Sequence, residues 1–137
     1  MEIIYNSNRN FRIWAYTVSH SSLLLRSEMK YPDQDNYTDS VSSNIDLEFW
    51  EVSYINLPSD FLGLCIREIT EESLPKKISR DFLRFDMKIF ELKSQKSTYY
   101  IIAGGLLVGE NKWINQDRIF NYSCNLKHDK ILFCSNG

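Results

Sequence analysis

The segment VSHSSLLLRS, residues 18–27, carries the side chains of this sequence that most resemble catalytic groups. His20 lies among Ser19, Ser21 and Ser22, and a serine with a histidine base can attack a carbonyl carbon. That chemistry needs the base about 3 Å from the hydroxyl and a third group that orients the base. Neighbouring residues of a strand point to opposite faces, and no G-x-S-x-G motif exposes any of these serines. We therefore expect the tip of a β-hairpin here, with a serine hydrolase as the alternative.

The only other histidine of the sequence is His128. His20 and His128 could act as the acid and the base of phosphodiester cleavage if the fold brought them into one cleft. The surrounding segment LKHDKI instead predicts a polar turn in which His128 faces solvent. Two histidines and three dispersed cysteines, without H-E-x-x-H or C-x-x-C spacing, predict no structural metal site and no cofactor.

Three aspartates lie in the polar, turn-rich stretch from 28 to 44, and their spacing resembles a calcium-binding loop. In an EF-hand pattern that starts at Asp33, position six is Thr38 where glycine is required, and position twelve is Asn44 instead of glutamate. The EF-hand pattern therefore fails. We expect a long solvated loop of the kind that often carries function, with a looser divalent-cation site as the alternative.

The stretch NIDLEFW alternates, which predicts a strand with Asp46 and Glu48 on one face and apolar residues on the other. Paired carboxylates can do acid–base chemistry if their environments differ. On an outward face they are solvated or pair with an arginine of the neighbouring strand. We expect Asp46, Glu48 and the nearby Glu51 to contribute to a binding surface.

Arg26 is the candidate partner for these carboxylates, because its charge follows an apolar run. If the preceding hairpin closes through residues 19–21, Trp14 lies opposite Arg26 and their side chains can stack. The sequence favours a structural role for Arg26 over ligand binding.

The segment GENKWINQDR places Trp113 and Arg118 in a polar loop. A tryptophan among charged residues has the composition of a binding surface, and the alternative is a ring that folds back over the core. The glycines at 104 and 105 lack the spacing of a phosphate-binding loop. They predict a bend in a strand or the close approach of another part of the chain.

The periodicity is that of β-strands almost throughout, and the fold class is predicted to be mainly β. Strands are expected at 11–19, 21–27, 44–52, 60–69, 84–93, 97–109, 118–124 and 130–135. One short helix is expected at 75–83, because Pro75 suits a first helical turn. Together these elements predict a single domain over residues 1–137, an antiparallel sandwich or partly closed barrel of about eight strands.

The composition is that of an ordinary globular protein, with 43% hydrophobic and 25% charged residues. The net charge of −2 hides an asymmetry: residues 1–75 hold 5 Lys/Arg and 12 Asp/Glu, whereas residues 76–137 hold 11 and 6. Either the two halves pair with each other, or the acidic half attracts a basic partner. An acidic chain does not favour nonspecific nucleic-acid binding.

The three cysteines do not form a disulfide framework. Cys65 is expected in the core, and Cys124 and Cys134 can pair only if their Cα atoms come within about 7 Å. No apolar segment approaches the roughly 20 residues of a membrane span, and the N-terminus lacks the pattern of a signal peptide. These features predict a cytoplasmic protein with no membrane partner.

The function expected from these features is a non-catalytic protein- or ligand-binding module. One specific version is a bacterial immunity-type or accessory protein whose acidic half blocks a basic partner. The alternatives are an enzyme on a β scaffold and a structural homo-oligomer with aromatic contacts. The candidate catalytic residues are His20, Arg26 and His128, and the candidate binding residues are Asp46, Glu48, Glu51, Trp113 and Arg118.

Overall fold

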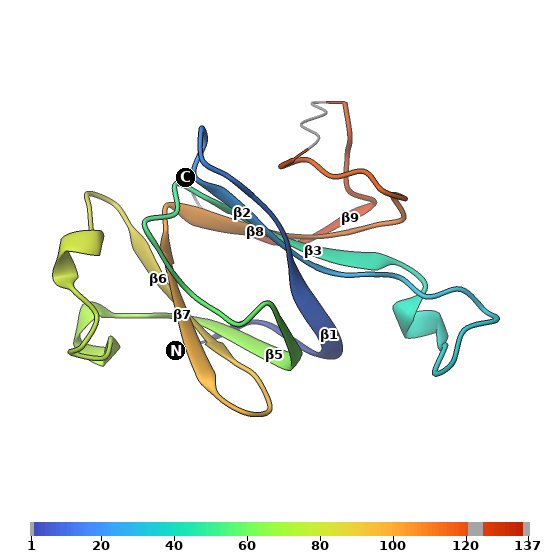
Figure 1. The fold of residues 1–137 in the computed structure, drawn as a ribbon, viewed down its shortest axis with the longest axis horizontal. Helices are drawn as coiled ribbons and strands as arrows, with labels where there is room; N and C mark the ends of the chain where they lie inside the picture. Colours follow the sequence, from blue (N-terminus) through green and yellow to red (C-terminus); the bar gives the residue numbers. More distant parts are fainter. Residues whose placement is uncertain (1, 121–124, 136–137) are drawn as a thin grey trace.

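The structure, a computed structural model, describes residues 2–120 and 125–135, and its strands form one antiparallel sheet (Figure 1). The sheet order is β4-β7-β6-β5-β1-β2-β3-β8-β9. The nine strands of the described residues are β1 (Ile3–Thr17), β2 (Ser22–Ser27), β3 (Asn44–Trp50), β4 (Tyr54–Asn56), β5 (Asp60–Ile69), β6 (Lys88–Lys93), β7 (Thr98–Ala103), β8 (Gly105–Asn111) and β9 (Lys130–Cys134). Three 3-10 turns lie between strands: η1 (Asp39–Val41), η2 (Glu71–Ser73) and η3 (Arg80–Phe82).

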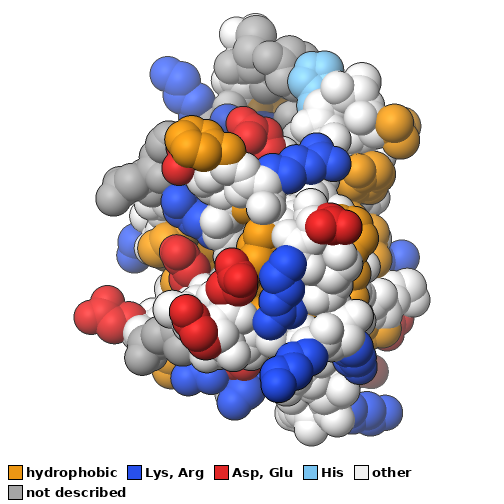
Figure 2. All heavy atoms as spheres, turned by 90° about the vertical axis from the view of Figure 1, so that its left-hand side faces the viewer, with side chains coloured by type: hydrophobic (Ala, Val, Ile, Leu, Met, Phe, Trp, Pro, Cys, Tyr) orange, Lys and Arg blue, Asp and Glu red, His pale blue; other side chains and the backbone are white. Residues whose placement is uncertain are grey.

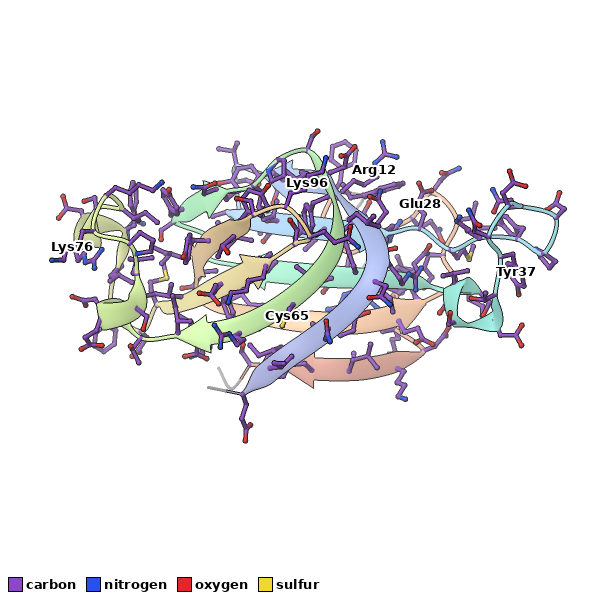
Figure 3. The ribbon with its side chains drawn as sticks, turned by 90° about the horizontal axis from the view of Figure 1, so that it is seen from below. Arg12, Glu28, Tyr37, Cys65, Lys76 and Lys96 are labelled. Atoms are coloured by element: carbon purple, nitrogen blue, oxygen red, sulfur yellow. The ribbon has the colours of Figure 1, made fainter. Side chains whose placement is uncertain are left out.

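The long strand β1 divides the sheet into two layers that pack against each other. Residues 3–12 of β1 pair with β5, and residues 12–17 pair with β2, with register shifts along both ladders. Such irregularities bend a strand, and Figure 3 shows β1 and β5 curving across the remaining strands. The rings of Phe49 in β3 and Phe90 in β6 meet at 5.6 Å, although four strand pairings separate these strands in the sheet order. The predicted antiparallel β fold is therefore confirmed, as a folded sheet that does not close into a barrel among the described residues.

The core lies between the two layers and follows the predicted alternation. Ile45, Leu47 and Phe49 point into it from β3, and Leu23 and Leu25 point into it from β2. Burying a leucine or phenylalanine side chain contributes about 1.5–3 kcal/mol, so this face of β2 and β3 supplies much of the hydrophobic stabilisation. The opposite face of β2, β3 and β8 is called the outer face below.

The short helix predicted at 75–83 is present only as the 3-10 turn η3 at Arg80–Phe82, and no α-helix forms in this segment. The guanidinium of Arg80 donates to the carbonyls of Glu71, Leu74, Pro75 and Ile78, so backbone acceptors in this segment bond to a side chain. A proline inside this stretch also cannot donate a helical hydrogen bond.

Other boundaries also differ from the sequence-based expectation. The strand predicted at 84–93 begins only at Lys88, after a turn in which Asp86 has a φ of 61°, and Phe85 is 93% exposed. The stretch predicted at 97–109 with a bend or interruption at its glycines is β7 and β8, which Gly104 separates, so the predicted interruption is confirmed. Residues 118–120 of a further predicted strand form bends, and residues 121–124 lie outside the described part. The short strand β4 was missed.

Two loops extend from opposite ends of the sheet. Tyr37 marks the 28–43 loop in Figure 3, and Lys76 marks the 71–87 segment. Arg9 holds the base of the first loop, donating to Ser27 Oγ and to the carbonyls of Ser27 and Ser43. On the side of the molecule that carries residues 71–87, positive and negative side chains are interspersed (Figure 2).

Cys65 is half-buried between the core residues Leu64 and Ile66, so its predicted place in the core is wrong. Cys124 lies outside the described residues, and so does the condition on its pairing with Cys134. Within the described ranges, no helix is long and apolar enough to cross a membrane.

Candidate functional site

The outer face of β2, β3 and β8 carries a row of polar side chains that a distant segment of the chain covers. The register places Arg26 opposite Asp46, and Leu24 opposite Glu48. Of the described residues between β8 and β9, residues 113, 116, 118 and 128 contact this face. As a result, Asp46 is 0% exposed and Glu48 is 6% exposed.

Arg26 and Asp46 form a fully buried ion pair on this face. Arg26 Nε and Nη2 donate to the two carboxylate oxygens of Asp46 at 2.6 and 2.8 Å, the bidentate geometry that an arginine fork favours. Nη2 also donates to the carbonyl of Gln116 at 2.8 Å, which ties the covering segment to the sheet. The cross-strand pair considered in the sequence analysis is therefore present.

The hairpin register differs from the predicted one, yet the predicted stacking occurs. Arg12 lies opposite Arg26, the turn spans residues 18–21, and the ladder shifts register between Ile13 and Ala15. This irregularity lies at Trp14, and the Trp14 ring packs 4.9 Å from the Arg26 guanidinium carbon.

Asn111 and His128 extend the network from Asp46 to Glu48. Asn111 Nδ2 donates to Asp46 Oδ2 at 3.0 Å and lies 3.2 Å from His128 Nδ1. Its Oδ1 accepts from the backbone N–H of Trp113, which sets the orientation of the amide. Because an amide nitrogen can only donate, Nδ1 accepts, and the imidazole proton lies on Nε2. That Nε2–H donates to Glu48 Oε2 at 2.9 Å.

A glycine of β8 makes room for the imidazole. A Cβ at Gly109 would lie 2.4 Å from the His128 ring, closer than any side chain tolerates. The Trp113 ring packs against this imidazole in a tilted arrangement, with centroids 4.7 Å apart. Gly105 makes room for Trp50 in the same way. Glycines four residues apart on one strand face are the sequence signal that could have located the covered surface.

Glu48 is held less completely than Asp46. Its Oε2 accepts the hydrogen bond from His128, while its Oε1 lies 3.8 Å from Arg118 Nε, beyond hydrogen-bond distance. The residues opposite Glu48 on the two neighbouring strands are Leu24 and Leu107, which offer no side-chain donor. A largely buried carboxylate therefore has an oxygen that accepts no hydrogen bond from the described residues.

Glu48 lines a cavity of about 550 Å³ between the β1–β2 turn and the covering segment. The cavity walls include a polar side, with two residues of the turn, and an apolar side, with Trp50 and residues 119 and 120. The residues that line the cavity include Ser19, His20, Glu48, Trp50, Arg118 and Phe120. Ser19 Oγ lies 2.9 Å from His20 Nδ1, so these neighbours do make contact at the exposed turn, contrary to the strand-based argument.

Asp46, Glu48 and His128 could each offer one ligand atom to a metal ion, within 4.8 Å of one another. Hydrogen bonds already engage all three groups: Arg26 and Asn111 bind both oxygens of Asp46, and His128 donates to Glu48. The donor set is therefore accounted for as a charge and hydrogen-bond network.

The structure brings together more of the predicted site residues than their spacing in the sequence suggested. Six of the predicted residues belong to the outer-face network or border it: Arg26, Asp46, Glu48, His128, Trp113 and Arg118. The prediction that His128 faces solvent is wrong, because its side chain is 0% exposed. Asp46 and Glu48 are buried and do not form an exposed acidic patch.

Two candidates lie elsewhere. Glu51 is exposed, in a turn where its φ is 51°, and borders a hollow on the other side of Trp50. His20 lines the cavity, but Arg26 does not, so the two residues of the enzyme hypothesis do not share this pocket. The residues that sequence reasoning missed are Asn44 and Asn111, whose amides hold the backbone of Trp113.

The sequence matches no protein-family model, no curated protein and no solved structure. The geometry of the site is therefore the basis for the proposal of function.

Proposed function

We propose that this protein is a non-catalytic binding module that holds a small molecule in the cavity bordered by Glu48. The observation that supports the proposal best is the Glu48 side chain, 7% exposed and with one oxygen that accepts no hydrogen bond from the described part of the chain. Small-molecule sites are commonly concave, about 300–1,000 Å³ in volume, and mostly apolar with a few placed polar groups. The cavity at Glu48 fits each of these features.

The ligand-binding version of the expected module is favoured over the protein-binding version. A basic protein partner would need accessible acidic groups, and Asp46 and Glu48 are both covered. The enzyme alternative keeps one observation in its favour, the contact between Ser19 and His20 at the cavity. Arg26, which that hypothesis also required, is committed to Asp46.

A fragment screen by ¹⁵N-resolved NMR tests the proposal. Ring-containing fragments that enter the cavity are expected to shift the backbone amides of Ser19, Glu48 and Arg118 together. The variant Ser19→Trp should block these shifts by filling the mouth of the cavity. Ser73→Trp, a matched change in the exposed turn η2, should leave them intact.

Two results would overturn the proposal. One is a screen in which no fragment shifts these three amides as a group. The other is covalent labelling of the protein by a fluorophosphonate that disappears in Ser19→Ala, because it would indicate an activated serine and hence the enzyme alternative.

A further inference from the structure

We infer that the ligand of this cavity carries a cationic nitrogen, such as a primary ammonium group, on an apolar body that contains a ring. The inference rests on the proposed function and specifies the ligand class for the same site. In it, Glu48 Oε1 accepts from the ammonium group, and the body lies against the apolar wall.

The two outer-face carboxylates, Asp46 and Glu48, differ in the number of hydrogen-bond donors that they accept. Asp46 accepts three N–H donors, two from Arg26 and one from Asn111. Among the described residues Glu48 accepts one, from His128. No fully buried side-chain oxygen of the described residues lacks a partner, so the second oxygen of Glu48 is reached from the cavity, where a further donor can bind it.

Arg118 does not supply that donor. Its Nε lies 3.8 Å from Glu48 Oε1, and its side chain is 37% exposed, so solvent screens the pair. The apolar neighbours Leu24 and Leu107 cannot donate either. The acceptor at the cavity wall therefore remains open to a ligand group.

The charged side chains at the cavity favour one sign of ligand charge. Charge-assisted hydrogen bonds are roughly twice as strong as neutral ones, so an ammonium group gains more from Glu48 than a hydroxyl does. An anionic group would meet the Glu48 carboxylate, and only the partly exposed Arg118 would attract it. The cavity therefore favours a cation over a neutral isostere and a neutral isostere over an anion.

The aromatic side chains of the cavity wall favour a ring in the body of the ligand. The Trp50 ring packs against Gly105, and Trp50 and Phe120 both line the cavity. Aromatic faces attract cations as well as apolar groups, and tryptophan does so best. A ring next to an ammonium group matches this pairing of a carboxylate with aromatic side chains.

Three probes of nearly equal shape test the inference: 2-phenylethylamine, 2-phenylethanol and 3-phenylpropionate. Each is titrated against the unmodified protein, and the dissociation constant is taken from the Glu48 and Arg118 amide shifts. The amine is expected to bind at least tenfold more tightly than the alcohol, and the acid more weakly than either.

The variant Glu48→Gln keeps the size of the side chain and removes its charge. It should reduce the amine to the affinity of the alcohol and leave the alcohol unchanged. Glu51→Gln is the matched control, because Glu51 carries the same charge close by but outside the cavity, and it should preserve the tenfold preference.

The outcomes separate this inference from the proposed function. Equal binding of the three probes, or tightest binding of the acid, overturns the ligand class while the cavity remains a binding site. Binding of library fragments but of none of the three probes has the same meaning. Failure of both probes and fragments overturns the inference together with the proposed function. Because the probe series uses the unmodified protein, its result does not depend on how Glu48→Gln folds.

Discussion

Asp46 and Glu48 lie two residues apart on the same face of β3, and their carboxylates have different hydrogen-bond partners. Asp46 sits between Arg26 and Gly109 on the neighbouring strands and accepts three N–H donors. Glu48 sits between Leu24 and Leu107 and accepts one donor, from His128. The first carboxylate is enclosed by the fold, whereas the second borders a cavity.

The difference shows how one strand face can serve both stability and binding. A bidentate arginine satisfies a buried carboxylate and leaves no room for a ligand. A carboxylate that accepts a single donor from the described residues, here from His128, keeps the ability to accept a further group. The number of donors around each carboxylate, and not its residue type, therefore distinguishes the structural acid Asp46 from the candidate binding acid Glu48.

The largest effect is expected when the enclosed pair is broken. Arg26→Met leaves the Asp46 charge buried without its main partner, and such losses cost about 3–5 kcal/mol of unfolding free energy. Urea denaturation followed by circular dichroism measures the change. The double variant Arg26→Met/Asp46→Leu should recover most of it, because no buried charge remains. A loss of less than about 1 kcal/mol in the single variant would show that solvent reaches Asp46.

An intermediate effect on the unfolding free energy is expected at the contact between Gly109 and His128. In Gly109→Ala the new Cβ would lie 2.4 Å from the imidazole, so the ring must move away from Glu48. Overpacking of this kind costs about 1–3 kcal/mol, measured by thermal and urea unfolding. In a His128→Ala background the same change should cost much less, because the clashing ring is gone. Equal costs in both backgrounds would contradict the contact, since residues that interact give non-additive changes.

The smallest effect is expected at the open side of Glu48. Arg118→Gln removes a partly exposed charge 3.8 Å from the carboxylate. Exposed pairs contribute about 0–1 kcal/mol, so the unfolding free energy should change by no more than about 0.5 kcal/mol. Unfolding at low and high salt provides the check. A loss close to that of Arg26→Met would mean that Arg118 encloses Glu48 as Arg26 encloses Asp46.

Much of the inner architecture was predictable from local pattern. The alternation in NIDLEFW placed Ile45, Leu47 and Phe49 in the core, and the structure confirms it. The positions of most strands also followed from apolar and β-branched runs. Of the helix predicted at 75–83 only the 3-10 turn at Arg80–Phe82 forms, and the carbonyls of residues 74, 75 and 78 accept from the Arg80 guanidinium, a contact that no local pattern shows.

The candidate site was only partly predictable. Arg26 was recognised as a charge in need of a carboxylate or a ring, and it meets both Asp46 and Trp14. His128 was assigned to solvent because its neighbours are polar. Its burial depends on Gly109, nineteen positions earlier, and on Trp113, and no local pattern links these residues.

The sequence by itself determined the β class of the protein and the face on which each residue of β3 lies, because side chains alternate along any extended strand. Only the tertiary structure decided that the outer face is covered, because described residues between β8 and β9, such as Gln116 and His128, return across strands that are distant in sequence. It likewise decided which carboxylate received the arginine, since that depends on the register of three strands. Pairing across strands is non-local, and the difference between Asp46 and Glu48 arises there.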